Sequence, residues 1–245
     1  TDLVLHAFAE AARALRAIEA RASLYRGSDL VRLNALGRLP HPAADLLEML
    51  RLAGAVHDAT GGAFDATVQP LWQARRLGTP EGPAAALAGW DHVRLAEDEI
   101  RLARPGMALT LNGLGQGYVA DRVAALLQAE GLTDILIDTG EMRALGGRPW
   151  PVRIPHGGEV PLSARALATS APRGTCFDAP GRDGHILDPR TGGPAVSPWA
   201  EISISAPSAA LADALSTAAC LTRDRAELTA LLAPFSAARL EGARL

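Results

Sequence analysis

Apolar residues recur at helical spacing in several stretches of the chain, which predicts amphipathic helices there. The first stretch runs from Leu3 to Ala22, and the second covers about Ala43 to Asp58. A third, GLGQGYVADRVAALLQAEG, is entered through glycines and closes at Gly131, a residue suited to a helix C-terminus. AALADALSTAACL and RAELTALLA predict two closing helices. The apolar face of the first helix is expected to comprise Leu5, Phe8, Ala12, Leu15 and Ile18.

The segments between these helices show strand and loop patterns. HVRLAEDEIRLARPGMALTLN predicts strands joined by tight turns, and TDILIDTG predicts a buried strand because Ile135, Leu136 and Ile137 are apolar in succession. PWPVRIP, ARALATSA, GHILD and AEISISA predict further short strands. SLYRGSDLVRLNALG breaks the helical period, TGGAFDATVQPL predicts a loop entering a short element, and GTPEGPAAALAG predicts a surface connection. Strands and helices mix irregularly, and neither a repeat nor a clear linker divides the chain.

Composition narrows the class of protein. Hydrophobic residues make up 48% of the 245 residues and charged residues 21%, which is ordinary for a globular protein with a sizeable core. The net charge of −3 does not indicate a basic surface for binding nucleic acid or an anionic membrane. No apolar run approaches the roughly 20 residues needed to span a bilayer. Cys176 and Cys220 are too few for a disulfide framework or a zinc site.

Three glycines open the third predicted helix. Gly113, Gly115 and Gly117 let backbone N–H groups approach a ligand closely at a helix N-terminus, where phosphate binds favourably. The same glycines are equally compatible with a tight turn between a strand and a helix. The run from Gly115 to Ala120 also matches the dinucleotide fingerprint G-x-G-x-x-A, with Asp138 at the end of the next strand. A Rossmann oxidoreductase is therefore an alternative, although the chain lacks the regular alternation of that fold.

A carboxylate and a hydroxyl lie four residues apart in the stretch ADALSTAA. On a helix, this spacing places the oxygens of Asp213 and Thr217 on one face. Hard oxygen ligands of this kind suit Mg²⁺ together with water and phosphate oxygens. The alternative is an ordinary amphipathic helix whose aspartate caps the helix or pairs with an arginine.

The stretch GHILDPRTGGPA gathers polar side chains at the mouth of a turn. His185 to Asp188 predicts a short strand, which Pro189 ends because it has no N–H to donate. His185 is suited to act as an acid or a base, or to hold a phosphate or an adenine edge. Asp188 is suited to take the proton from an attacking hydroxyl, or it caps its own turn.

In their order along the chain, seven stretches together resemble the ApbE family of flavin transferases (FAD:protein FMN transferases). The resemblance covers about Ser23 to Ala219, and the elements His-x-x-Asp-Pro-x-Thr-Gly and Asp-Ala-Leu-x-Thr-Ala are fairly specific together. The stretches are SLYRGSDLVRLN, TGGAFDATVQPL, LNGLGQGYVADRV, DTGEMRALGG, LATSA, HILDPRTGGPA and ADALSTAA.

The resemblance implies a fold, a reaction and a partner. The fold is a single α+β domain over residues 1–245, with two lobes of mixed sheet and helices around a flavin cleft, and with the family's N-terminal strand missing or trimmed. The reaction is the cleavage of FAD with Mg²⁺ and the attachment of FMN, through a phosphoester, to a threonine of an acceptor protein. That acceptor is typically a subunit of a membrane redox complex, which implies a periplasmic location.

The resemblance also assigns residues to roles. His185 and Asp188 are the expected catalytic residues, with Asp188 as the base that deprotonates the threonine. The metal is expected at the side chains of Asp213 and Thr217 and at a backbone carbonyl near Gly113. The expected flavin nucleotide site comprises Tyr25, Asn112, Gly113, Gly115, Gln116, Gly117, Glu141, Thr169, Ser170, His185 and Thr191.

The glycine loop departs from the family pattern Asp-Leu-Gly-x-x-Ala-Lys-Gly. The chain carries Asn112 for the aspartate and Gln116 for the lysine, so a cation beside the pyrophosphate is lost. Such a loss removes charge stabilisation worth a few kcal/mol in the transition state. Two alternatives follow, namely a flavin-binding protein without transferase activity and an FAD pyrophosphatase in which water replaces threonine.

Overall fold

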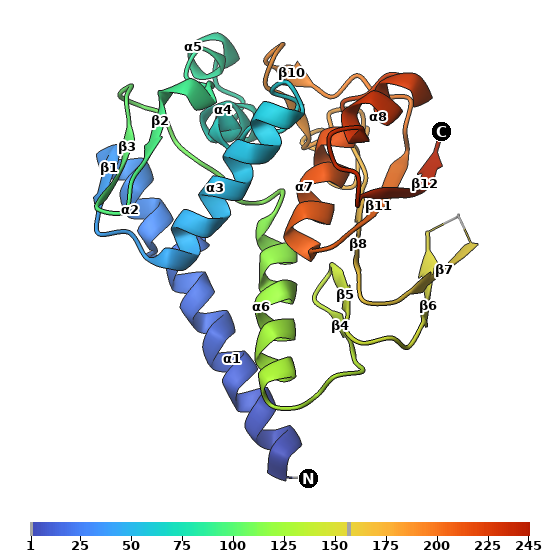
Figure 1. Ribbon diagram of the computed structural model, residues 1–245. Coiled ribbons are helices and arrows are strands. Elements are labelled where there is room, and N and C mark those ends of the chain that lie inside the picture. The colour runs from blue at the N-terminus through green and yellow to red at the C-terminus, as the bar shows by residue number, and fades with distance from the viewer. Residues whose placement is uncertain (1, 156–157) are drawn as a thin grey trace.

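The computed structural model describes residues 2–155 and 158–245, in which helices and short strands follow one another irregularly (Figure 1). The α-helices are α1 (Asp2–Ala22), α2 (Asp29–Leu36), α3 (Ala44–Ala59), α4 (Gln69–Leu77), α5 (Glu81–Ala85), α6 (Gly115–Ala129), α7 (Ala209–Ala219) and α8 (Arg225–Leu232), with 3₁₀ turns η1 (Ala66–Val68) and η2 (Trp90–His92). The strands are β1 (Arg38–Pro40), β2 (Val93–Leu95), β3 (Glu99–Leu102), β4 (Leu136–Asp138), β5 (Met142–Ala144), β6 (Trp150–Ile154), β7 (Gly158–Leu162), β8 (Ala166–Ser170), β9 (Leu187–Asp188), β10 (Gly193–Pro194), β11 (Glu201–Ala206) and β12 (Arg239–Arg244).

The largest sheet has five strands in the order β12-β11-β8-β5-β4, and every neighbouring pair in it is antiparallel. Helix α7 packs against β8 and β11, and α6 packs against β4 and β5. The two helices also contact each other and α1 lies along α6 (Figure 1). This arrangement places the start of α6 beside α7, where the predicted glycine loop and the predicted metal ligands meet.

A smaller sheet, in the order β1-β3-β2, belongs to a second group of elements with α2, α3 and α4. Helix α3 confirms the predicted period, since the apolar positions of its inner face are fully buried, including Leu46, Leu50 and Val56. These side chains share one continuous core with residues from the C-terminal half, such as Leu215 and Leu228. The two lobes expected around a cleft are therefore joined by a common core, and the α+β class is confirmed.

Helix α1 follows its predicted range but not all of its predicted face. Ala11 packs with Val123 of α6, and Ile18 is buried in the main core. Leu15 remains 38% exposed, whereas Ala7, Ala11 and Ile18 of the same helix are buried. The side chains of Leu5 and Phe8 lie outside the described residues.

Several elements were not predicted from the sequence. Helix α2 begins where the stretch SLYRGSDLVRLN was interpreted as a break: Ser28 caps it by accepting the N–H of Val31 at 3.0 Å. It ends at Gly37, whose φ of 68° is left-handed. The others are α5, inside the predicted surface connection, the short strands β1, β7 and β10, and β12, a partly exposed edge strand paired with β11. Within the described residues, no helix has the length and apolarity required to cross a membrane.

Candidate active site

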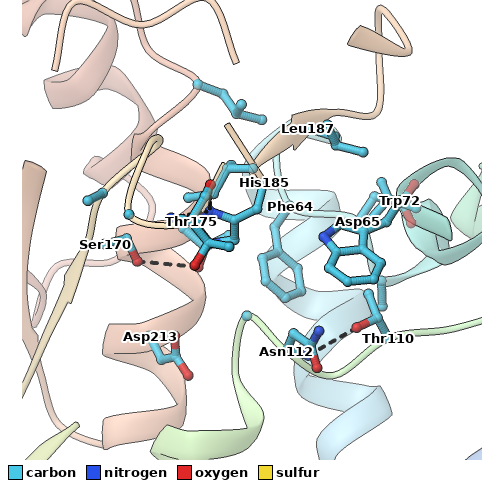
Figure 2. A pocket seen from close by; sticks show the side chains of 18 of the residues that line it. Phe64, Asp65, Trp72, Thr110, Asn112, Ser170, Thr175, His185, Leu187 and Asp213 are labelled. Atoms are coloured by element: carbon cyan, nitrogen blue, oxygen red, sulfur yellow. Dashed lines mark hydrogen bonds between the residues drawn. The ribbon is translucent and has the colours of Figure 1, made fainter. Parts of the chain in front are cut away.

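A cavity of about 890 Å³ opens between the two groups of elements. One wall comes from the segment around η1 and α4, and the other from β8, the loop that follows it and α7 (Figure 2). The volume lies within the range typical of sites for small molecules and cofactors. Most of the residues assigned to the site from the sequence line it: Tyr25, Asn112, Gly113, Gln116, Glu141, Thr169, Ser170, His185, Asp213 and Thr217.

Oxygen atoms of four residues lie close together at one corner of the cavity. We call this the metal corner, and it is formed by Gly113, Ser170, Asp213 and Thr217. Asp213 and Thr217 lie on the same face of α7, as the spacing predicted. The Thr217 and Ser170 hydroxyl oxygens are 3.5 Å apart. A Cβ added to Gly113 would lie 3.3 Å from the Thr217 hydroxyl and 3.0 Å from the Phe64 ring. The absence of a side chain at Gly113 therefore lets the backbone approach this corner.

Two carboxylates are deeply buried here: Asp213 in the metal corner and Glu141 elsewhere in the cavity lining. Asp213 is 4% exposed and accepts one backbone N–H, that of Gly117, at 3.3 Å. Burial raises the pKa of Asp213. Burial also raises the pKa of Glu141, and the charge of Asp213 raises it further. Burial therefore favours the neutral form of both carboxyl groups unless a cation binds beside them.

The glycines of the loop act mainly in packing. Gly115 and Gly117 are not among the residues that line the cavity. The N–H of Gly115 donates to the Leu111 carbonyl at 2.7 Å, and a Cβ at Gly117 would lie 2.2 Å from the Ala209 carbonyl oxygen. Gly117 is thus required by the close contact of α6 with the start of α7. Gly113 is the one of the three glycines that faces the cavity.

The Rossmann alternative is wrong. The strand pairs in the described part of the chain are antiparallel, and the segment before the loop, residues 107–111, does not form a strand. A dinucleotide fingerprint requires a parallel strand that leads into the helix. The match to G-x-G-x-x-A therefore reflects helix packing.

The loop presents neutral side chains to the cavity. Asn112 donates its backbone N–H to the Thr110 hydroxyl at 3.2 Å, and both residues line the cavity (Figure 2). With Gln116 at the lysine position of the family pattern, the aspartate position six residues earlier falls on Thr110 rather than on Asn112. Among the lining residues, Arg76 is the one arginine, and its guanidinium carbon lies 5.5 Å from the centre of the Trp72 ring.

His185 lies on the cavity wall, as predicted (Figure 2). Its Nδ1 is 3.1 Å from the Thr175 carbonyl oxygen and 3.3 Å from the Thr175 N–H nitrogen. Burial lowers the pKa of His185, so the ring is neutral at neutral pH. Because the Thr175 backbone occupies Nδ1, Nε2 is the ring nitrogen left for a ligand.

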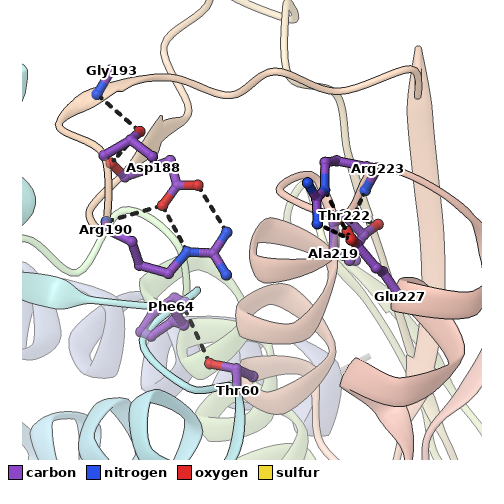
Figure 3. A network of polar contacts seen from close by, with 10 residues as sticks. Thr60, Phe64, Asp188, Arg190, Gly193, Ala219, Thr222, Arg223 and Glu227 are labelled. Atoms are coloured by element: carbon purple, nitrogen blue, oxygen red, sulfur yellow. Dashed lines mark hydrogen bonds and ion pairs between the residues drawn. The ribbon is translucent and has the colours of Figure 1, made fainter.

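Asp188 and Thr191 do not line the cavity, in contrast to the sequence expectation. Successive side chains of a strand point to opposite faces, and in β9 Leu187 faces the cavity. The Asp188 carboxylate instead accepts the Arg190 guanidinium at 2.9 and 2.8 Å (Figure 3). Burial alone would raise the pKa of Asp188, but the hydrogen bonds and charge of Arg190 lower it overall. The Asp188 backbone carbonyl accepts the N–H groups of Thr191 and Gly192, so Asp188 anchors the turn.

An aromatic wall, formed by Phe64, Trp72 and Phe177, was missed from the sequence. The chain has four Trp, four Phe and two Tyr, and these three line the cavity together with Tyr25. The Trp72 and Phe177 rings meet edge to face with centres 5.4 Å apart. The stretch TGGAFDATVQPL contains one residue of this wall, Phe64, but Phe177 comes from a loop more than a hundred residues later. The spacing of residues along the sequence could not predict this contact between Trp72 and Phe177.

Comparison with known proteins agrees with this geometry. The family model described as "ApbE family" matches residues 2–236. The chain belongs to the ApbE family. The family accounts for the co-occurrence of the glycine loop, the histidine turn and the helix α7 motif around one cavity.

Several FAD:protein FMN transferases match this chain at moderate sequence identity. The FAD:protein FMN transferase of Haemophilus influenzae is 30% identical, over 83% of this chain and 68% of its own length. That of Klebsiella pneumoniae is 29% identical, and the match covers 78% of this chain and 63% of that protein. That of Treponema pallidum is 36% identical over 57% of this chain and 44% of its own length. The chain thus spans a little under two thirds of the Klebsiella relative.

Solved structures share the fold. The apo form of the Pseudomonas stutzeri flavinyl transferase ApbE superimposes with a TM-score of 0.82 at 29% identity, covering 92% of this chain and 78% of that one. The flavin transferase ApbE of Vibrio cholerae gives a TM-score of 0.83 at 23% identity, covering 98% and 87% of the two chains. At 23% identity, the similarity to the Vibrio cholerae structure shows only that the fold is shared.

Proposed function

We propose that this ApbE chain is an Mg²⁺-dependent FAD:protein FMN transferase that attaches FMN to a threonine of an acceptor protein. The observation that carries the proposal is the cavity itself, which joins an aromatic wall to a corner of buried oxygen ligands. An aromatic wall suits a flavin or adenine ring, and the oxygen corner suits a metal-bound pyrophosphate. The names of the relatives support the same activity.

The metal corner fits a hard divalent cation. Asp213 is buried with a single backbone partner, and a hydroxyl and a backbone approach at Gly113 lie beside it. We assign the metal to the side chains of Asp213 and Thr217 and the carbonyl of Gly113. When bound, Mg²⁺ would neutralise charge on the phosphoryl oxygens of FAD.

In the proposed reaction, the threonine oxygen forms a bond with the phosphorus atom of the FMN half. The bond between that phosphorus and the bridging oxygen breaks, and AMP leaves with the electron pair. The hydroxyl proton needs an acceptor on the protein. His185 is better placed for this role than Asp188, since it lines the cavity and is neutral, whereas both Asp188 oxygens bind Arg190.

The remaining residues position the nucleotide. Trp72, Phe64 and Tyr25 offer ring faces, and Gln116 and Asn112 offer neutral amide groups. Arg76 supplies the positive charge that the glycine loop does not. The proposal extends to the acceptor, which we infer to be a subunit of a membrane redox complex in the periplasm.

The test is transfer to an acceptor fragment that carries its target threonine. Protein, FAD and Mg²⁺ are incubated with the fragment, and its labelling is followed by in-gel flavin fluorescence. FMN and AMP are measured in parallel without acceptor. Rapid release of both without acceptor would establish the pyrophosphatase, which the neutral loop at Thr110, Asn112 and Gln116 favours as second candidate. FAD binding without turnover in either assay would leave only a flavin-binding protein.

A further inference from the structure

Glu141 lies in the turn before β5, and one of its carboxylate oxygens has no partner. The residue is 7% exposed and lines the cavity. Its Oε2 is buried and makes no hydrogen bond with the described residues. A buried carboxylate oxygen without a partner is costly to the folded state. This oxygen therefore calls for a ligand that the protein itself does not provide.

The neighbouring protein charges do not meet this need. In the described part of the chain, no ion pair joins a basic side chain to Glu141 or to Asp213. Arg143, two residues along the chain, lies 3.3 Å from Asp121 instead. Arg76, the arginine of the cavity, stacks on Trp72. Two mutually repelling carboxylates thus share one cavity, and neither forms an ion pair with a described basic side chain.

Two partners could relieve this arrangement, a shared proton or a metal ion. A shared proton would serve the carboxylates alone. A hard divalent cation would also use the hydroxyl oxygens of Ser170 and Thr217, which lie 3.5 Å apart in the same cavity. The cation therefore accounts for more of the observed oxygen atoms than the proton does.

We propose that Glu141 is a further oxygen ligand of the divalent cation held by Asp213 and Thr217. The inference rests on the metal dependence proposed above and adds the carboxylate that precedes β5. The metal would then link the turn before β5 to α7. Glu141 would act on the metal, and through it on the phosphoryl group.

The experiment measures metal binding to the intact chain without FAD. Mn²⁺ alone is the probe, and water-proton relaxation reports its affinity. Glu141→Gln is expected to weaken Mn²⁺ binding by about 10- to 100-fold. Glu201→Gln is the matched control, because Glu201 also has a buried oxygen without a hydrogen-bond partner but lies on β11 outside the cavity. The control should bind Mn²⁺ like the wild type.

The outcomes separate this inference from the proposed function. Wild-type Mn²⁺ affinity in Glu141→Gln, alongside lost affinity in Asp213→Asn, would overturn the role of Glu141 and leave the metal site intact. No Mn²⁺ binding by the wild type would overturn the metal-dependent function and this inference together. If Glu141→Gln does not melt cooperatively, Glu141→Asp decides the question. Its shorter side chain should weaken binding, and unchanged affinity would overturn the proposal.

Discussion

Two carboxylate sites of this molecule differ in whether a basic side chain of the protein pairs with them. Asp188, the last residue of β9, is neutralised by Arg190 two residues away. Asp213 and Glu141, on α7 and before β5, are more deeply buried and form no ion pair with a described basic residue. A carboxylate that the chain neutralises locally stabilises a turn, whereas one left without a cation is suited to bind one.

The largest effect is expected at Asp213. Asp213→Asn keeps the shape of the side chain but removes a negative charge from the metal corner, so the rate of FMN transfer should fall by about 10³-fold. FAD affinity should fall much less, because the aromatic wall remains. In-gel flavin fluorescence of the acceptor gives the rate, and fluorescence quenching gives the affinity. Transfer at the native rate in millimolar Mg²⁺ would show that Asp213 is only a helix residue.

His185 comes next, because it belongs to the same turn region as Asp188 but faces the cavity. His185→Gln should lower the transfer rate by about 10²-fold if the ring accepts the threonine proton. Burial lowers the pKa of His185, so the neutral base persists in acid, and the wild-type rate should decline only below the ordinary histidine value of about 6.5. A pH–rate profile measures this limb. The same limb in the glutamine variant would exclude His185 as its source.

A substitution at Gly117 tests the close contact of α6 with the start of α7, the helix that carries Asp213 and Thr217. Gly117→Ala would drive a Cβ into the Ala209 backbone, with a contact of 2.2 Å before relaxation. We expect the free energy of unfolding to fall by about 1–3 kcal/mol, because α6 must move away from α7. Gly115→Ala is the control, since its Cβ would meet only the Leu111 side chain at 3.8 Å. Equal stabilities of the two variants in urea unfolding would contradict the packing role.

The smallest effect is expected at Asp188. Asp188→Asn should lower the free energy of unfolding by about 0.5–1 kcal/mol, as for a partly exposed ion pair, and change the transfer rate little. Since the folded-state pKa of Asp188 is lowered, its contribution is present above the ordinary aspartate value of about 3.9 and is lost as the pH falls through the folded-state value. Urea unfolding at pH 7 and pH 3 measures the difference between variant and wild type. A rate loss as large as that of His185→Gln would restore Asp188 as the base.

Much of the local structure could be predicted from the sequence. The apolar period of α3 and the four-residue spacing of Asp213 and Thr217 each depend on residues within one helix. Helix geometry alone converts such spacing into a shared face. The predictions failed where the pattern was short or exposed, as for α2, with its local Ser28 cap, and for the edge strand β12.

The sequence by itself determined which residue types stand at which helix positions and turns, since those relations span only a few residues. Tertiary structure decided which of them meet. It brought Glu141 into the same cavity as Asp213, packed Phe177 against Trp72 and turned Asp188 away from the cavity. These contacts join segments separated by tens of residues or more, or depend on which face of a short strand is covered. Local propensity cannot specify either, because both follow from how the sheet and the helices bury their apolar surfaces together.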